Sequence, residues 1–161
     1  MVINYYSETG HVLRYKKQDD VGLDLPLFKT GDVVPPVKDW KDKIFIPQGK
    51  CATFSTGIHV EFPKDCWGFL KERSSSAWRG LVVLGGVLDP GYIGEIFVMM
   101  GNIGDNDFVA VDGHSLAQMI LIPRYNVDKH QKPDGISFHM VPKDILSQTD
   151  RGDGGFGSTD D

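Results

Sequence analysis

The sequence of 161 residues is poor in cysteine, in positive charge, in long apolar runs and in helical periodicity. Because it contains only Cys51 and Cys66, a disulfide framework is excluded as the main source of stability, and a reducing compartment such as the cytoplasm is expected. The formal net charge of −5 argues against nucleic acid as a partner. No apolar stretch approaches the roughly 18 residues of a membrane-spanning helix, so no membrane partner is expected.

The chain is instead rich in residues that form strands and turns. Its 19 glycines and 9 prolines separate short runs of valine, isoleucine, phenylalanine and threonine. This pattern predicts an all-β fold, a sandwich or jelly roll, with one short helix that begins at Ser75 or Ser76 and ends at Gly80. The run Leu116–Ile122 is almost continuously apolar and is expected to be buried on both faces. The predicted strands are Ile44–Ile46, Cys51–Val60, Trp67–Leu70, Leu81–Leu88, Tyr92–Met100, Phe108–Val111, Leu116–Ile122 and Ser137–Val141.

Length and composition predict a single domain over residues 1–150, followed by a tail over residues 151–161. The tail contains four glycines in eleven residues, and we expect it to form a mobile arm unless a ligand orders it. Two polar inserts, at residues 30–43 and 128–135, are expected to be surface loops. These inserts are candidate contacts for a protein partner that the sequence does not identify.

The segment from Asp89 to Tyr92 contains Pro90 and Gly91 between two apolar runs, which is typical of a tight turn. The runs Leu81–Leu88 and Tyr92–Met100 are therefore expected to form a hairpin with Asp89 and Tyr92 near its tip. A carboxylate and an aromatic ring on a rigid tip suit a general base and a stacking platform. The alternative is a turn-forming aspartate with a cross-strand tyrosine.

Two further segments carry polar groups that suit an anion. Ser74 and Ser75 precede a short helical turn beside Arg73, so hydroxyls, backbone N–H groups and a guanidinium lie together. The alternative there is an ordinary helix start with a structural arginine. Gln118 interrupts an apolar run and needs hydrogen-bond partners, for which a bond to the backbone is the simpler explanation.

The tail nearly matches the phosphate-binding loop of nucleotide triphosphatases, but Ser158 stands where that pattern has lysine. No strand–loop–helix pattern surrounds it, so that class of enzyme is excluded. Converging backbone N–H groups, the hydroxyls of Ser158 and Thr159, and the cation of Arg151 still suit a phosphate. Phe156 stands alone among glycines and suits a cover over a flat ligand. The alternative is a flexible terminal linker.

Taken together and in order, five segments resemble the motifs of the trimeric deoxyuridine triphosphatase (dUTPase) family. The resemblance covers about residues 20–160. The third and fifth segments are specific, whereas the first and fourth are weak individually. The five segments are Val21-Gly22-Leu23-Asp24-Leu25, Arg73-Ser74-Ser75-Ser76-Ala77, Gly86-Val87-Leu88-Asp89-Pro90-Gly91-Tyr92-Ile93-Gly94-Glu95-Ile96, Gly113-His114-Ser115-Leu116-Ala117-Gln118 and Arg151-Gly152-Asp153-Gly154-Gly155-Phe156-Gly157-Ser158-Thr159.

The resemblance implies hydrolysis of dUTP to dUMP and pyrophosphate with Mg²⁺, which keeps uracil out of DNA and supplies dUMP for dTMP synthesis. It implies a homotrimer of jelly-roll, distorted β-barrel subunits with active sites at the subunit interfaces, over which the C-terminal arm closes. The three phosphates and water are expected to supply most of the ligands of Mg²⁺, while Asp24 contacts the waters around the ion. A viral member would act in the cytosol or nucleus of its host.

The resemblance also implies roles for individual residues. Asp89 would deprotonate the water that attacks the α-phosphorus in line, and Tyr92 would pack under the deoxyribose. Backbone around Gly86 and Phe97 would bind the uracil edge, and Arg73 would pair with a carboxylate at the subunit contact while backbone beside it meets phosphate. The full set of implied substrate-binding residues is Arg73, Ser74, Ser75, Gly86, Val87, Tyr92, Phe97, Gln118, Arg151, Phe156, Gly157, Ser158 and Thr159.

The sequence departs from the family pattern at Val21, at Ser76, at the pair His114-Ser115 and at Asp160, which adds a negative charge near the expected γ-phosphate. Two other functions fit parts of the sequence. A dCTP deaminase shares the motifs up to the turn but carries its catalytic glutamate ten positions after the aspartate, where this chain has Met99. A non-catalytic trimer that uses the nucleotide as a switch for partner binding has no need of the carboxylate of Asp89.

Overall fold

The computed structural model describes residues 2–29, 43–123 and 137–146. Almost all of the regular structure in these residues is β, with one four-residue helix, α1 (Ser74–Ala77), and one short 3-10 turn, η1 (Lys143–Ile145). The prediction of an all-β fold is confirmed. The strands are β1 (Val2–Ser7), β2 (Gly22–Lys29), β3 (Lys43–Ile46), β4 (Cys51–Glu61), β5 (Cys66–Glu72), β6 (Leu81–Leu84), β7 (Val87–Leu88), β8 (Glu95–Asn102), β9 (Phe108–Val111), β10 (His114–Pro123) and β11 (Ser137–Met140).

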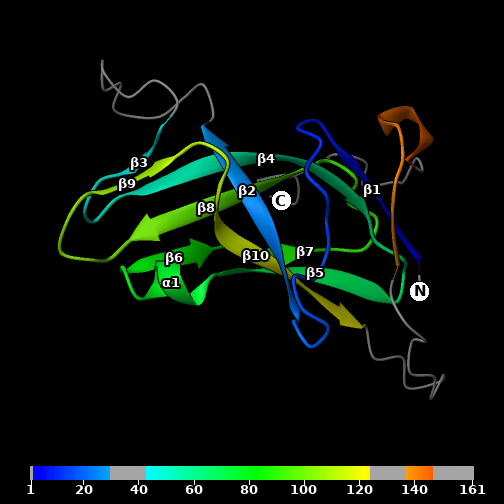
Figure 1. Ribbon diagram of the computed structural model, residues 1–161, viewed down its shortest axis with the longest axis horizontal. Helices are drawn as coiled ribbons and strands as arrows, with labels where there is room; N and C mark the ends of the chain where they lie inside the picture. Colours follow the sequence, from blue (N-terminus) through cyan, green and yellow to red (C-terminus); the bar gives the residue numbers. More distant parts are fainter. Residues whose placement is uncertain (1, 30–42, 124–136, 147–161) are drawn as a thin grey trace, which may run out of the picture.

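Nine of the described strands form one sheet, which curls around the core (Figure 1). Its hydrogen-bonded order is β11-β1-β4-β2-β10-β5-β7, and β8 joins β4 to β6. Strands β3 and β9 form a separate two-stranded ribbon at one end. Among the described pairs only β1 and β11 run parallel, so the sheet is built almost wholly from antiparallel neighbours.

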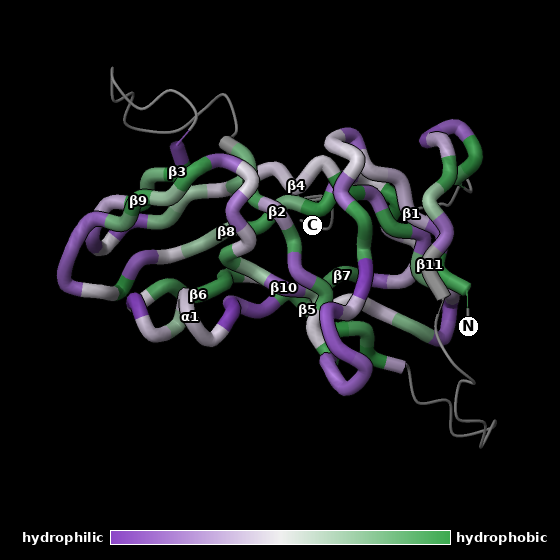
Figure 2. The backbone as a smooth tube through the Cα atoms, viewed as in Figure 1, coloured by the Kyte–Doolittle hydropathy of each residue, from purple (hydrophilic) through white to green (hydrophobic). Residues whose placement is uncertain are grey.

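The core follows from the alternation of side chains along the strands. In β8, for example, Ile96, Val98 and Met100 are buried and the residues between them are partly exposed. Each such apolar side chain contributes about 2 kcal/mol when it leaves water. Figure 2 shows apolar residues gathered along the strands and polar residues in the connecting turns. No helix in the described part of the chain has the length and hydropathy needed to cross a membrane.

Every predicted strand has a counterpart, but the run Leu81–Leu88 is not one strand. It breaks after Leu84, because the Gly86 carbonyl accepts a 2.6 Å hydrogen bond from the Leu70 N–H and the chain changes partner there. As a result β6 pairs with β8, whereas β7 pairs with β5. The prediction of a hairpin with Asp89 at its tip is therefore only partly right: β6 pairs with β8, but the turn at Asp89 follows β7, which pairs with β5 instead.

The expectation that Leu116–Ile122 is buried on both faces is wrong for the single chain. Leu116, Ala117, Met119 and Leu121 are buried, whereas Gln118, Ile120 and Ile122 keep partial exposure. The strand lies between β2 and β5, so both its edges are paired. Only one of its two faces, however, packs against the core of the same chain.

Replacing Gly80 by alanine is expected to destabilise the fold far more than the same change at Gly49. Both residues have a positive φ, +78° and +69°, which costs alanine about 1–2 kcal/mol. A Cβ at Gly80 would also lie 2.5 Å from the Gly104 backbone, whereas a Cβ at Gly49 would meet nothing within 4 Å. We expect a loss of about 3 kcal/mol or more for Gly80→Ala and about 1 kcal/mol for Gly49→Ala.

Urea unfolding of the two variants checks this expectation. The difference between the two losses isolates the backbone contact between the α1–β6 and β8–β9 connections, because the conformational cost is common to both. Equal losses would show that these connections separate without cost.

Candidate active site

The turn that carries Asp89 has the geometry that its sequence predicts. The Tyr92 N–H donates a 3.2 Å hydrogen bond to the Asp89 carbonyl, and Gly91 has a φ of +88°. Asp89 directly follows β7, which pairs with β5 through Gly68 opposite Leu88. The aspartate is partly exposed at a cavity of about 410 Å³ lined by Trp67, Val87, Asp89 and Pro90. A rigid backbone thus presents this carboxylate to an open space.

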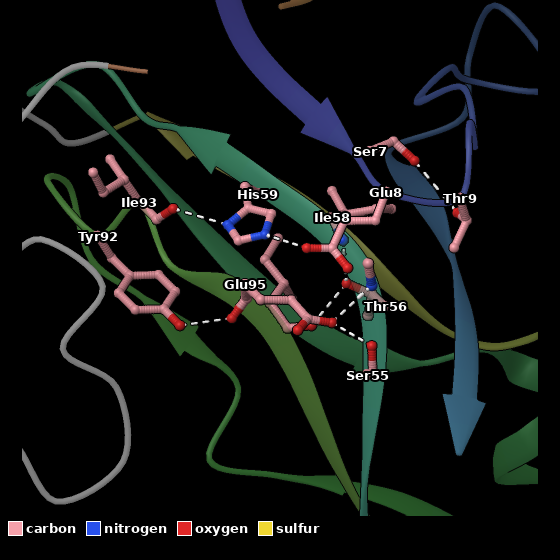
Figure 3. Close-up of polar contacts among 12 residues, drawn as sticks. Ser7, Glu8, Thr9, Ser55, Thr56, Ile58, His59, Tyr92, Ile93 and Glu95 are labelled. Atoms are coloured by element: carbon pink, nitrogen blue, oxygen red, sulfur yellow. Dashed lines mark hydrogen bonds and ion pairs between the residues drawn. The ribbon is translucent and has the colours of Figure 1, made fainter. Parts of the chain in front are cut away.

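Tyr92 packs into the protein immediately beyond this turn. Only 9% of the residue is exposed, and its hydroxyl donates a 2.6 Å hydrogen bond to the Glu95 carbonyl (Figure 3). Together with Phe97 it lines a second cavity of about 680 Å³. The structure therefore brings Tyr92 and Phe97 to one cavity, and Asp89 and Val87 to the other.

Arg73 lies in a different part of the chain and joins three strands. Its Nε is 3.1 Å from Asp24 Oδ1, and its Nη1 donates a 2.8 Å hydrogen bond to the Ser115 carbonyl. Lys16 also pairs with the Asp24 carboxylate, whose side chain is only 14% exposed. The carboxylate partner of Arg73 is therefore Asp24 of the same chain, where the sequence had suggested a carboxylate at a subunit contact.

The serines after Arg73 divide into two groups. Ser74 and Ser75 are exposed at the start of α1, so their hydroxyls face the surroundings of the helix. Ser76 is buried, and its hydroxyl donates a 2.8 Å hydrogen bond to the Leu116 carbonyl. This bond explains how a buried serine is accommodated at a position where the sequence departs from the family pattern.

Glu72 is a polar residue near the site that the sequence did not single out. Its carboxylate accepts a 3.0 Å hydrogen bond from the Val83 N–H and pairs with Lys71, and its carbonyl accepts a 3.2 Å bond from Gln118 Nε2. Burial by itself raises the pKa of Glu72, but the hydrogen bonds from Lys71 and the Val83 backbone outweigh it and lower the pKa. The predicted bond of Gln118 to backbone is confirmed.

The two groups of candidate residues lie at opposite ends of β5. Trp67, near the start of the strand, lines the cavity of Asp89, and Arg73 follows its last residue, Glu72. The six-residue step from Trp67 to Arg73 corresponds to about 20 Å of extended chain. One chain by itself therefore does not place Asp89 beside the serines of α1.

Several expected residues cannot be placed. Arg151, Phe156, Gly157, Ser158, Thr159 and Asp160 lie outside the described residues, as do most of the two polar inserts. Within the described residues, no group of three or more histidine, cysteine, aspartate or glutamate side chains is close enough together to hold a metal ion.

Comparisons with known proteins identify the family of this chain. The dUTPase family model matches residues 8–160. The deoxyuridine 5'-triphosphate nucleotidohydrolase of Clostridium tetani is 33% identical over 160 residues, which make up 98% of this chain and 94% of that protein. The Pol polyprotein of equine infectious anemia virus (strain Wyoming) is 31% identical over 150 residues, 93% of this chain but only 11% of the polyprotein.

Solved structures show the same fold. The native dUTPase of EIAV superposes with a TM-score of 0.63 at 26% identity, covering 82% of this chain and 96% of that one. The dUTPase of phage phi11 of S. aureus gives a TM-score of 0.62 at 17% identity, covering 83% and 97%. Since the family model covers nearly the whole chain and a full-length relative is one third identical to it, this chain belongs to the dUTPase family.

Proposed function

We propose that this protein hydrolyses dUTP to dUMP and pyrophosphate, with Asp89 as the general base. Family membership and the full-length relative from Clostridium tetani, which carries that activity in its name, support the reaction. The observation that carries the residue assignment is the position of Asp89. Its carboxylate stands on a hydrogen-bonded turn at the rim of a cavity, and the buried ring of Tyr92 follows it directly.

In this reaction the Asp89 carboxylate accepts a proton from a water molecule as the water oxygen attacks the α-phosphorus in line. The bond between the α-phosphorus and its bridging oxygen to the β-phosphate breaks, and pyrophosphate leaves. The turn contributes by fixing the carboxylate, because a base that must first be ordered loses part of its advantage. In β8 the deaminase position is Met99, which has no proton to exchange.

Tyr92 supplies the surface on which the deoxyribose lies. Its hydroxyl donates to the Glu95 carbonyl at 2.6 Å, which restricts movement of the ring away from the sugar and so disfavours a 2′-hydroxyl. Backbone of Gly86, Val87 and Phe97 reads the edge of uracil, so the nucleotide extends across the two cavities lined by Val87 and by Phe97. Polar recognition of this kind discriminates strongly, since a wrong base leaves buried polar groups unpaired.

Each active site is shared between subunits of a homotrimer. The support is the separation of about 20 Å along β5 between the Asp89 cavity and the serines of α1. A second copy that brings its Ser74, Ser75 and Gln118 to the Asp89 cavity of the first closes this gap. The arm of residues 151–161, with Arg151, Phe156, Gly157, Ser158 and Thr159, completes the pocket around the γ-phosphate and uracil.

Mg²⁺ fits this arrangement as an ion bound with the substrate. The phage phi11 dUTPase, which shares the fold, coordinates a structural Mg(II) ion, and a phage 80alpha dUTPase was solved with dUpNHpp. In this chain the Asp24 carboxylate is already held by Arg73 and Lys16, which suits contact through water better than direct ligation. When bound, the ion neutralises phosphate charge and holds the triphosphate in one conformation.

Pyrophosphate release with Mg²⁺ from dUTP, dCTP, dTTP and UTP tests the proposed function. We expect turnover of dUTP and at least about 100-fold lower kcat/KM for the other three, because each presents a group that the pocket cannot pair or admit. Ammonia release from dCTP would identify a deaminase instead. Tight dUTP binding without turnover would identify a nucleotide-gated binding protein.

A further inference from the structure

His59 on β4 is buried and has both ring nitrogens engaged, yet the reaction described above does not use it. Only 3% of the residue is exposed. Its Nδ1 lies 3.2 Å from the Ile93 carbonyl oxygen, and its Nε2 lies 3.3 Å from Glu8 Oε1 (Figure 3). The ring also contacts Tyr6, with centroids 5.7 Å apart. Burial of a polar ring is costly unless such bonds are made, so these contacts fix its orientation.

Strand β4 is irregular next to His59, whose ring faces the segment that follows the Asp89 turn. The register of β4 against β8 shifts between Ser55 and His59. Glu95 braces this irregularity, because its carboxylate accepts a 2.8 Å hydrogen bond from the Gly57 N–H and a second bond from the Ser55 hydroxyl. The Thr56 hydroxyl adds a 2.7 Å bond to the Ile96 carbonyl. The start of β8 is thus locked onto β4.

The direction of the His59 hydrogen bond follows from its partner. The Ile93 carbonyl can only accept, so Nδ1 carries a proton and donates it in this bond. Ile93 directly follows Tyr92, whose own hydroxyl is bound to the Glu95 carbonyl. The segment from Tyr92 to Glu95 is therefore anchored at two points, by His59 at Ile93 and by the tyrosine hydroxyl at Glu95 (Figure 3).

We infer that His59 is a positioning residue that sets the preference for deoxyribose over ribose. Its Nδ1–H holds the Ile93 carbonyl and thereby keeps the Tyr92 ring against the sugar. The inference rests on the proposed function, in which Tyr92 excludes a 2′-hydroxyl. His59 does not touch the reacting atoms, so its loss acts on recognition of the sugar rather than on water attack.

Two substitutions at this position separate the two ring nitrogens. The amide nitrogen of His59→Asn lies near the place of Nδ1 and can still donate to Ile93, whereas that of His59→Gln lies near the place of Nε2 and faces Glu8. For His59→Gln we expect KM for dUTP to rise about tenfold and the dUTP-over-UTP preference in kcat/KM to fall about tenfold, with kcat little changed. For His59→Asn we expect values within about threefold of the unaltered protein.

Thermal unfolding of both variants provides the control, since both lose the same ring and its packing on Tyr6. Equal kinetic losses in the two variants, or a fall in kcat with KM and sugar preference intact, would overturn the positioning role. Nitrogen NMR of the imidazole in the unaltered protein is a test that needs no variant: a protonated Nδ1 is expected, and a bare Nδ1 would overturn the inference. If the unaltered protein turns over dUTP and the variants keep its KM and its dUTP-over-UTP preference, this inference alone is refuted. If the unaltered protein does not turn over dUTP, the proposed function is refuted as well.

Discussion

Replacing Asp89 by asparagine is expected to lower kcat for dUTP by about three orders of magnitude, within the range that a general base contributes. The amide has the same shape as the carboxylate but does not accept the proton of the attacking water. The turn itself should persist, because the bond that closes it runs from the Tyr92 N–H to the backbone carbonyl of residue 89. Substrate binding should therefore survive the loss of turnover.

Pyrophosphate release and binding of a non-hydrolysable dUTP analogue, measured side by side, check this expectation. Asp105→Asn is a matched control, because this substitution removes the same charge from an exposed residue away from the cavity. Asp105 lies in the connection between β8 and β9. A variant that keeps more than about a tenth of the original kcat would assign the base to another group. A variant that loses binding together with turnover would make Asp89 a binding residue.

The second large effect is a recovery of activity when two inactive variants are mixed. Asp89→Asn removes the proposed general base from the turn, and Ser75→Glu places a carboxylate where a phosphate is expected. Ser75 is exposed at the start of α1, where a negative charge is well tolerated by the helix, so this variant should fold. If each site takes its turn from one subunit and its α1 from another, some sites of a mixed trimer contain two intact halves.

Random assembly of equal amounts of the two variants should restore about one quarter of the unaltered activity, since each half of a site has an even chance of being intact. The variants are unfolded in urea and refolded together, and dUTP turnover is compared with that of each variant refolded alone. Activity that stays at the level of the separate variants would place both halves of the site within one chain. The assembly mass of the refolded mixture shows directly whether trimers have formed.

The turn and most strands could be predicted because their causes are local. Pro90 and Gly91 restrict the backbone wherever they occur, and the runs behind β4, β8 and β10 alternate or cluster clearly. Strands β1 and β2 were not predicted. The run Asn4-Tyr5-Tyr6 mixes polar and aromatic residues, which hides the alternation of β1. In β2 the buried Leu23, Leu25 and Leu27 alternate clearly, but Pro26 within the run counts against a strand.

The polar contacts of the site were mostly beyond prediction because they join residues far apart in the chain. The pair Arg73–Asp24 and the bond from the Val83 N–H to Glu72 depend on the register of three strands. The contacts of His59 could not be predicted for the same reason, since nothing next to it in sequence indicates that Ile93 or Glu8 is its partner. For Gln118 the need for a hydrogen-bond partner could be predicted, because it is a polar residue in an apolar run.

The parallel pairing of β1 with β11 has a consequence for synthesis of the chain. Val2 lies opposite Ser137, so β1 obtains its outer neighbour only after the residues up to Ser137 have been synthesised. Until then β1 presents an open edge, and open edges pair readily with other chains. Contacts between such distant segments also form slowly. Nascent chains that stall before Ser137 should consequently be prone to aggregate, and synthesis of β11 should be the step that ends this exposure.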